Sequence, residues 1–358
     1  KELKDLERKD RIDHVWLIRA LNNLIYHSEE TVDIPINVLV VEFTDGFLDE
    51  LDKFSSMIWP YDVTNFNKQT MGHFTGIGVR ITKEPNKPLK VVTPLLDTPA
   101  YKAKIKAGDL IIKVDGMSTA NKTIDKLVKR IMGPTGSTVV LTIKRRGVPK
   151  PFEVSVVRKA VRIRTVKGWQ RRPDGEWGYL LNGGRKIGYI RIRQFTGTTR
   201  TTIHKALRSL KEQGVSSLVL DLRSNPGGLL RSATRVANEF LATGRIVFTR
   251  GRQVPRNEIK ANKKGTYLQG DLVVLMDEQS ASAAEILSGA LKDWDRGVIV
   301  GQRSYGKGSV QNVIPVRRDE ALLKLTTAYY YLPSGRLLHR QNNAEGWGVD
   351  PDVEVYVT

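Results

Sequence analysis

The chain has 358 residues, more than one typical domain holds, so we expect two or three units that each bury their own core. Its 58 Lys and Arg exceed its 38 Asp and Glu and give a net charge of +20, but the cations are spread along the sequence and nucleic acid is not an expected partner. Because there are no cysteines, disulfides, thiolate zinc sites and a cysteine nucleophile are excluded. The 5 histidines are scattered, and we expect neither a metal nor a cofactor.

The first 70 residues are expected to be helical. From 12 to 28 the apolar residues recur at helical spacing, and Leu48, Leu51 and Phe54 indicate a second helix. We interpret residues 1–70 as a helical N-terminal region with an accessory or oligomerisation role.

Residues 71–162 are predicted to form a compact module of short strands around one helix. The predicted strands lie at 77–81, 89–92, 110–114 and 139–143. The predicted helix lies at 124–132. This pattern of short strands differs from the helical pattern of the preceding region, so we place a domain boundary near 71.

From 163 to 358 the pattern changes to strands that alternate with amphipathic helices. The expected strands lie at 187–192, 218–222, 272–276 and 298–300, and the expected helices at 203–210, 229–241 and 283–291. Such alternation is typical of stacked βα units. Residues 250–265 are polar and are expected to form a loose excursion from this core.

Ser282 is the first candidate for chemistry. The segment 277–285 links a predicted buried strand to a helix start, which places Ser282 at a helix N-terminus. Backbone N–H groups there carry partial positive charge and can stabilise an oxyanion that forms on a substrate carbonyl. Taken alone, a capping serine is the simpler interpretation.

Lys307 is the second candidate, because it lies between Gly306 and Gly308 just after a predicted strand. Flanking glycines allow tight backbone conformations and close approach to neighbouring chain. A lysine acts as a general base only when its pKa falls from about 10.4 towards neutrality, which burial achieves. Lys307 could then take the proton of Ser282, and Gln311 could orient the amine. The alternative is a solvated lysine in a turn.

The segment from Asp221 to Gly228 is the third element of interest. It runs from a strand through an Asn-Pro-Gly-Gly turn into a helix. An amide at Gly227 or Gly228 could join the amide of Ala283 in an oxyanion hole. Read alone, this segment is a good turn and nothing more.

Together, three motifs resemble those of the carboxyl-terminal processing proteases, also called tail-specific proteases. They are Ser-Ala-Ser-Ala-Ala-Glu around Ser282, Tyr-Gly-Lys-Gly-Ser-Val-Gln around Lys307, and Arg-Ser-Asn-Pro-Gly-Gly ending at Gly228. The similarity extends from 43 to 355, with departures at Lys53 and Phe54.

The resemblance implies a multidomain α/β protein: a helical N-terminal region, a PDZ domain at 71–162, and a protease core of the ββα, crotonase-like type at 163–358. It implies that Ser282 is the nucleophile, Lys307 the general base and Gln311 the residue that positions the lysine. Gly227 and Ala283 are then the oxyanion donors.

In the implied PDZ domain, a loop would hold the terminal carboxylate of a substrate tail that adds as a strand. The loop residues are Gly76, Ile77, Gly78 and Val79, and the candidates for the wall of the side-chain pocket are Leu127, Val128 and Ile131. A PDZ core needs apolar helix residues as well, so a core role remains equally open for these last three.

We therefore expect a serine endopeptidase that recognises apolar C-terminal tails and acts through an acyl-enzyme. The alternative is a catalytically inactive PDZ scaffold. An acyl-coenzyme-A enzyme of the crotonase type gives no reason for Lys307. The expected partners are proteins with apolar or unstructured C-termini and further copies of the chain, and an adaptor protein stays open.

The expected location is extracytoplasmic, in a periplasm, because the resemblance implies export. No apolar run approaches the ~20 residues that span a bilayer, and the charged start lacks a signal-peptide core. We expect a soluble chain whose signal or anchor lies outside the given sequence.

Overall fold

The computed structural model describes residues 13–181, 186–252, 254–316, 320–341 and 344–356. The chain folds as two compact units. The smaller unit comprises the chain up to 64 together with 250–255 and 309–329, and the larger unit comprises 65–249, 256–308 and the chain from 330 onwards. Within the described ranges, none of the helices has the length and apolar composition to span a bilayer.

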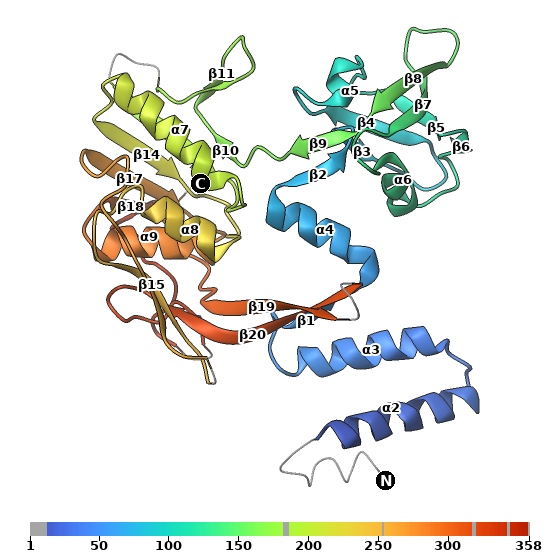
Figure 1. The fold of residues 1–358 in the computed structure, drawn as a ribbon, viewed down its shortest axis with the longest axis horizontal. Helices are drawn as coiled ribbons and strands as arrows, with labels where there is room; N and C mark the ends of the chain where they lie inside the picture. The colour runs from blue at the N-terminus through green and yellow to red at the C-terminus, as the bar shows by residue number, and fades with distance from the viewer. Residues whose placement is uncertain (1–12, 182–185, 253, 317–319, 342–343, 357–358) are drawn as a thin grey trace. The chain divides into compact units, whose positions relative to one another are not determined.

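The smaller unit combines two helices with a short antiparallel sheet (Figure 1). Its elements are α2 (His14–Glu29), α3 (Ile36–Asp49), β1 (Ser56–Ile58), β19 (Ser309–Val316) and β20 (Ala321–Tyr331). Strand β20 pairs with both β1 and β19. Strands that are far apart in the sequence therefore build one sheet.

The helix predicted around Leu48 to Phe54 lies earlier than expected, because α3 ends at Asp49. The physical reason is a turn closed by a side chain. Asp52 Oδ1 accepts hydrogen bonds from the backbone amides of Phe54 at 2.8 Å and Ser55 at 3.1 Å. An aspartate that binds the amides just after it favours a turn over a helix.

Helix α4 (Pro60–Met71) leads in the sequence to a β-rich module, in which the four predicted strands and the predicted helix occur together with further strands and a short helix that were not predicted. The module contains β2 (His73–Gly76), β3 (Val79–Thr82), β4 (Leu89–Pro94), α5 (Pro99–Lys102), β5 (Leu110–Val114), β6 (Met117–Ser118), α6 (Ile124–Ile131), β7 (Thr138–Lys144), β8 (Phe152–Val157) and β9 (Lys159–Arg162). Its main sheet has the order β3-β4-β5-β7-β8, so β3 is an edge strand (Figure 1).

The core of the module is formed by side chains that alternate between buried and exposed positions along its strands. In β7 every second side chain is buried, as a half-buried strand requires, and Val139, Leu141 and Ile143 are all inaccessible to solvent. Helix α6 begins after the capping residue Thr123 and buries Leu127 in the core of the module.

The remaining part of the larger unit is built on a six-stranded sheet of order β10-β13-β14-β17-β18-β21. Its strands are β10 (Val166–Lys167), β13 (Ile187–Ile192), β14 (Ser217–Asp221), β17 (Asp271–Met276), β18 (Val298–Gly301) and β21 (Val353–Glu354). All neighbours are parallel except β10. Helices α7 (Thr199–Glu212), α8 (Leu230–Ala237) and α9 (Ala283–Asp293) connect the strands. A small hairpin of β11 (Gln170–Arg171) and β12 (Trp177–Gly178) follows β10 in the sequence.

The prediction of a loose excursion at 250–265 is wrong in part. Strand β16 (Asn257–Lys260) pairs antiparallel with β15 (Arg245–Arg250). This strand is short and polar, so apolar alternation could not reveal it. Ion pairs support it instead, since Glu258 lies 3.2 Å from Arg245.

The sheet topology brings the three sequence motifs to one edge. Strands β14, β17 and β18 are adjacent and parallel, so the segments after them, 222–228, 277–282 and 302–307, all leave the sheet at the same end. This is the edge at which open parallel sheets bind their ligands.

Candidate active site

Ser282 follows β17 and is the N-cap residue of α9. Its backbone has φ 53° and ψ −113°, a conformation that a residue with a side chain rarely adopts. Such strain costs on the order of 1–3 kcal/mol and persists only where the surroundings enforce it. The residue is 7% exposed, so Ser282 is buried.

Glu285 enforces this geometry, because four donors converge on its carboxylate. Oxygen Oε1 accepts from Ser304 Oγ at 2.5 Å and from the Gly306 amide at 2.7 Å. Oxygen Oε2 accepts from the amides of Ser282 at 2.6 Å and Lys307 at 2.9 Å. The Ser282 and Lys307 backbones therefore lie within two hydrogen-bond lengths of each other.

The Glu285 side chain is fully buried. Burial raises the pKa of its carboxyl, and the four hydrogen bonds oppose that shift without cancelling it. Glu285 was not among the predicted site residues. The signal was available, because Ser282 and Glu285 have the spacing of a capping box, in which the glutamate accepts from the amide of the capping serine.

Close packing explains the two glycines beside Lys307. A Cβ at Gly306 would lie 2.5 Å from Cδ1 of the Trp347 ring, and a Cβ at Gly308 would lie 2.4 Å from the His339 amide nitrogen. Real Cβ atoms do not approach other atoms so closely, so a side chain at either position would displace its neighbours. The backbone therefore approaches neighbouring chain as closely as the sequence predicted.

Further hydrogen bonds fix the loop that carries Lys307. Ser304 Oγ accepts from the Val349 amide at 2.7 Å, and the Ser304 amide donates to the Val349 carbonyl at 3.1 Å. The Tyr305 amide donates to the carbonyl of Ser280 at 3.0 Å. The loop after β18 is thus tied to the turn that precedes Ser282.

The turn after β14 packs directly against Ser282. A Cβ at Gly227, whose φ is +98°, would lie 2.7 Å from Ser282 Cβ, so only glycine fits there. The Gly227 amide donates to Asn225 Oδ1 at 2.9 Å, and Asn225 Nδ2 donates to the Ile192 carbonyl at 2.8 Å. Ala283 is the first residue of α9, where backbone amides have no acceptor within the helix.

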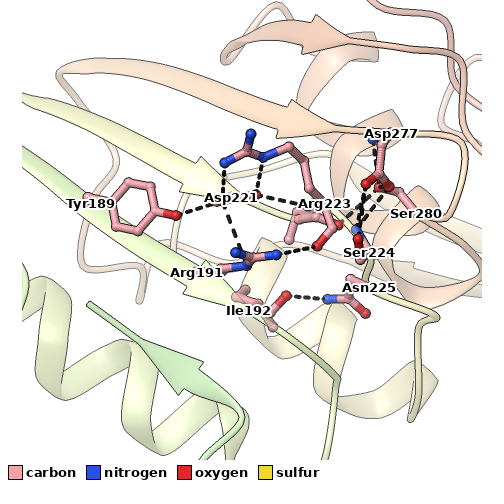
Figure 2. A network of polar contacts seen from close by, with 10 residues as sticks. Tyr189, Arg191, Ile192, Asp221, Arg223, Ser224, Asn225, Asp277 and Ser280 are labelled. Atoms are coloured by element: carbon pink, nitrogen blue, oxygen red, sulfur yellow. Dashed lines mark hydrogen bonds and ion pairs between the residues drawn. The ribbon is translucent and has the colours of Figure 1, made fainter. Parts of the chain in front are cut away.

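A polar network at the end of β14 holds this turn in place (Figure 2). Arg223 donates to both oxygens of Asp221, at 3.0 Å from Nε and 2.8 Å from Nη2, and Tyr189 Oη donates to Oδ2 at 2.6 Å. The Ser224 amide lies 2.9 Å from each oxygen of Asp277. The network therefore joins the turn after β14 to the turn after β17.

The charges of this network follow from the same contacts. Burial raises the pKa of Asp221, but hydrogen bonds from Arg223 and Tyr189 outweigh it, so that the net pKa is lowered. Burial, together with the hydrogen bond to Asp221, raises the pKa of Tyr189 to about 12. Neither Tyr189 nor Asp277 was predicted, because neither belongs to a motif that is recognisable without the fold.

The PDZ-like module has a groove between β3 and α6. Its volume is about 220 Å³, and its lining includes Gly76, Ile77, Gly78, Val79, Val128, Ile131, Phe74 and Met132. Leu127 does not line it, because its side chain is fully buried in the core of the module. For Leu127 the structure favours the core role that the sequence had left open beside a groove role, whereas Phe74 and Met132, which line the groove, were not predicted.

Gln311 belongs to the smaller unit, on β19. Its Nε2 donates to Ser309 Oγ at 2.8 Å and to Thr326 Oγ1 at 3.1 Å. The side-chain amide is therefore held from two sides.

Comparison with known proteins is consistent with this architecture. The sequence matches peptidase family S41 over residues 186–355 and the PDZ domain family over 91–145. A carboxy-terminal-processing protease of Bartonella bacilliformis is 39% identical over 332 residues, which cover 90% of this chain and 71% of the relative. A carboxyl-terminal-processing protease of Synechocystis sp. is 33% identical, with 95% of this chain and 75% of the relative covered.

Among solved structures, a photosystem II D1 C-terminal processing protease matches with a TM-score of 0.52 and 29% identity. The match covers 93% of this chain and 86% of that chain. A PDZ module joined to a mixed helix-and-strand peptidase core defines the class of protein. The chain belongs to the carboxy-terminal-processing protease family, within peptidase family S41, and is a serine-type peptidase.

Proposed function

We propose that this chain is an endopeptidase in which Ser282 is the nucleophile and Lys307 the general base. The supporting observation is that the amides of Ser282 and Lys307 bond to the same oxygen of Glu285, at 2.6 and 2.9 Å. Two loops pinned to one buried carboxylate can hold a nucleophile and a base in a fixed relation. Gln311 is proposed to position the lysine amine.

In the proposed reaction, Ser282 Oγ attacks the carbonyl carbon of the scissile peptide bond while its proton moves to the neutral amine of Lys307. The tetrahedral intermediate collapses with cleavage of the C–N bond, and the leaving amine takes the proton. Water then hydrolyses the acyl-enzyme and regenerates the Ser282 hydroxyl.

The oxyanion of the intermediate is proposed to bind the amide of Ala283 and an amide of the turn after β14. Gly227 serves only when its amide is released from Asn225 Oδ1, to which it donates at 2.9 Å. Gly228 is the alternative donor in the same turn.

The PDZ domain is proposed to recognise apolar C-terminal tails of protein substrates. Strand β3 is at the sheet edge, where a substrate tail can add as a further strand, and the adjoining groove is lined by apolar side chains such as Val128 and Ile131. The loop of Gly76, Ile77, Gly78 and Val79 would bind the terminal carboxylate.

We also propose the domain limits 1–70, 71–162 and 163–358, with a crotonase-like ββα core in the last. Self-association is supported by exposed apolar side chains on α2 and α3, among them Ile18 at 56% and Ile36 at 59%. A periplasmic location and an adaptor rest on the family resemblance alone.

The proposal is tested by mass spectrometry of the products formed from an unstructured protein with an apolar C-terminus. We expect defined fragments with the wild-type chain and none with Ser282→Ala or Lys307→Ala, while both variants still bind the tail. A wild-type chain that binds the tail without cutting it would instead be an inactive scaffold. Normal turnover by either variant would refute the assigned dyad.

A further inference from the structure

A chain of hydrogen bonds in the smaller unit connects the turn after α3 to Gln311. It begins at Asp52, whose Oδ2 accepts from Ser55 Oγ at 2.6 Å and whose Oδ1 accepts from Thr326 Oγ1 at 3.0 Å. Ser55 Oγ also accepts from the Thr326 amide at 3.1 Å. Two short segments distant in the sequence thereby meet at Thr326.

The same threonine hydroxyl contacts Gln311. Thr326 Oγ1 accepts from Gln311 Nε2 at 3.1 Å, and Ser309 Oγ accepts from the same nitrogen at 2.8 Å. Asp52, Thr326 and Gln311 are partly buried, and Ser55 is only 2% exposed. Water therefore competes less for these hydrogen bonds than it does at an open surface.

The direction of the chain follows from the charge at its start. Burial raises the pKa of Asp52, but hydrogen bonds from Ser55, Phe54 and Thr326 outweigh it and lower the net pKa. An ionised carboxylate only accepts hydrogen bonds, so the Thr326 hydroxyl must donate to it and can only accept from Gln311. The nitrogen of the Gln311 amide must then face Thr326, which settles the orientation of the amide.

We infer that Thr326 and Asp52 are positioning residues that hold the Gln311 amide in one orientation, with Nε2 towards Thr326. In this orientation Oε1 is the atom that accepts a hydrogen bond from the lysine amine. The inference rests on the proposed role of Gln311 in positioning Lys307. A carbonyl oxygen suits this role because it accepts a hydrogen bond from an amine, whereas a flipped amide would present a donor to another donor.

The test is a double-mutant cycle of Thr326→Val with Gln311→Ala, measured as kcat/KM for an apolar-tailed protein. Valine keeps the shape and suits a strand, and the Thr326 backbone amide keeps its bond to Ser55 Oγ. We expect Thr326→Val to lower kcat/KM about tenfold or more in the wild-type background, and to have little further effect beside Gln311→Ala. The conservative control Thr326→Ser keeps the hydroxyl and is expected to stay within about threefold of wild type.

An equal loss in both backgrounds would contradict the inference, as would Thr326→Ser that is as impaired as Thr326→Val. A second measurement is independent of activity: NMR detection of the Gln311 side-chain amide protons. We expect slow solvent exchange in the wild-type chain and fast exchange in Thr326→Val. Slow exchange in both proteins would overturn the inference. If the exchange rates were as expected but the wild-type chain cleaved no substrate, only the proposed function would be refuted.

Discussion

At the scale of single residues, Glu285 connects the two parts of the candidate site. The four groups that donate to its buried carboxylate are all neutral, and they belong to the loops that it joins. Each donor would be left unpaired in a buried setting if the carboxylate were lost. Glu285 is therefore expected to keep the Ser282 and Lys307 loops together.

Replacement of Glu285 by glutamine tests this role with almost no change of shape. Glutamine has one acceptor oxygen, so its NH₂ group must face two of the four donors. Each buried donor that is left unpaired costs about 1–3 kcal/mol of free energy. We expect Glu285→Gln to lower kcat/KM about 100-fold or more and to lower the free energy of unfolding in urea. The matched control is the exposed Glu278→Gln, which should behave like the wild-type chain. Full activity in Glu285→Gln would show that the shared carboxylate is not needed.

At the scale of secondary-structure elements, the groove between β3 and α6 depends on the backbone at Gly78. Its φ is +76°, and a Cβ there would lie 2.4 Å from Thr98 Cβ. Thr98 Oγ1 donates to the Gly78 carbonyl at 3.0 Å, so the side chain and the loop support each other. The loop conformation is thus set by close packing as well as by the freedom of glycine.

Alanine at Gly78 should disturb this loop, whereas alanine at Gly116 offers a matched control. Gly116 has nearly the same φ, +77°, but no atom lies within 4 Å of a Cβ there. Both changes carry the backbone cost of about 1 kcal/mol, so only the contact with Thr98 differs. We expect Gly78→Ala to weaken binding of an apolar-tailed peptide about tenfold or more, by fluorescence anisotropy, and Gly116→Ala to bind normally. If Gly78→Ala and Gly116→Ala bound the peptide with equal affinity, the loop at Gly78 would not be part of the tail-binding site.

The elements that the sequence predicted best are those with strong apolar periodicity. Strand β13 has the predicted limits, and helix α9 begins at the predicted Ala283. Strands β19 and β20 escaped notice, because most side chains of β19 are exposed or half-buried and the pairing with β1 joins distant parts of the sequence. Leu127 shows what periodicity cannot do: it marks the buried face of a helix but does not distinguish a core residue from a groove residue.

At the scale of the whole molecule, the parallel sheet explains why three scattered motifs belong together. The segments after β14, β17 and β18 emerge at one edge, because these strands are adjacent and parallel. The sequence indicated the alternation of strands and helices, but not the order of the strands in the sheet. The ties through Asn225 and Asp277 could not be foreseen, because these contacts arise only in the fold. For Glu285 the capping-box spacing was a local signal for its bond to the Ser282 amide, but not for its bonds to the loop that carries Lys307. The link from Asp52 to Gln311 spans still more of the chain, and no local pattern marks it.

The central claim is that Ser282 carries the acyl group and that Lys307 removes its proton. The most direct test is the reaction of the chain with an aryl ester of a short apolar peptide, followed by peptide mapping. We predict an acyl group on Ser282 that forms faster as pH rises, because a lysine must lose its own proton to act as a base. The same acylation rate in Lys307→Ala, or an acyl group on a different residue, would contradict the account.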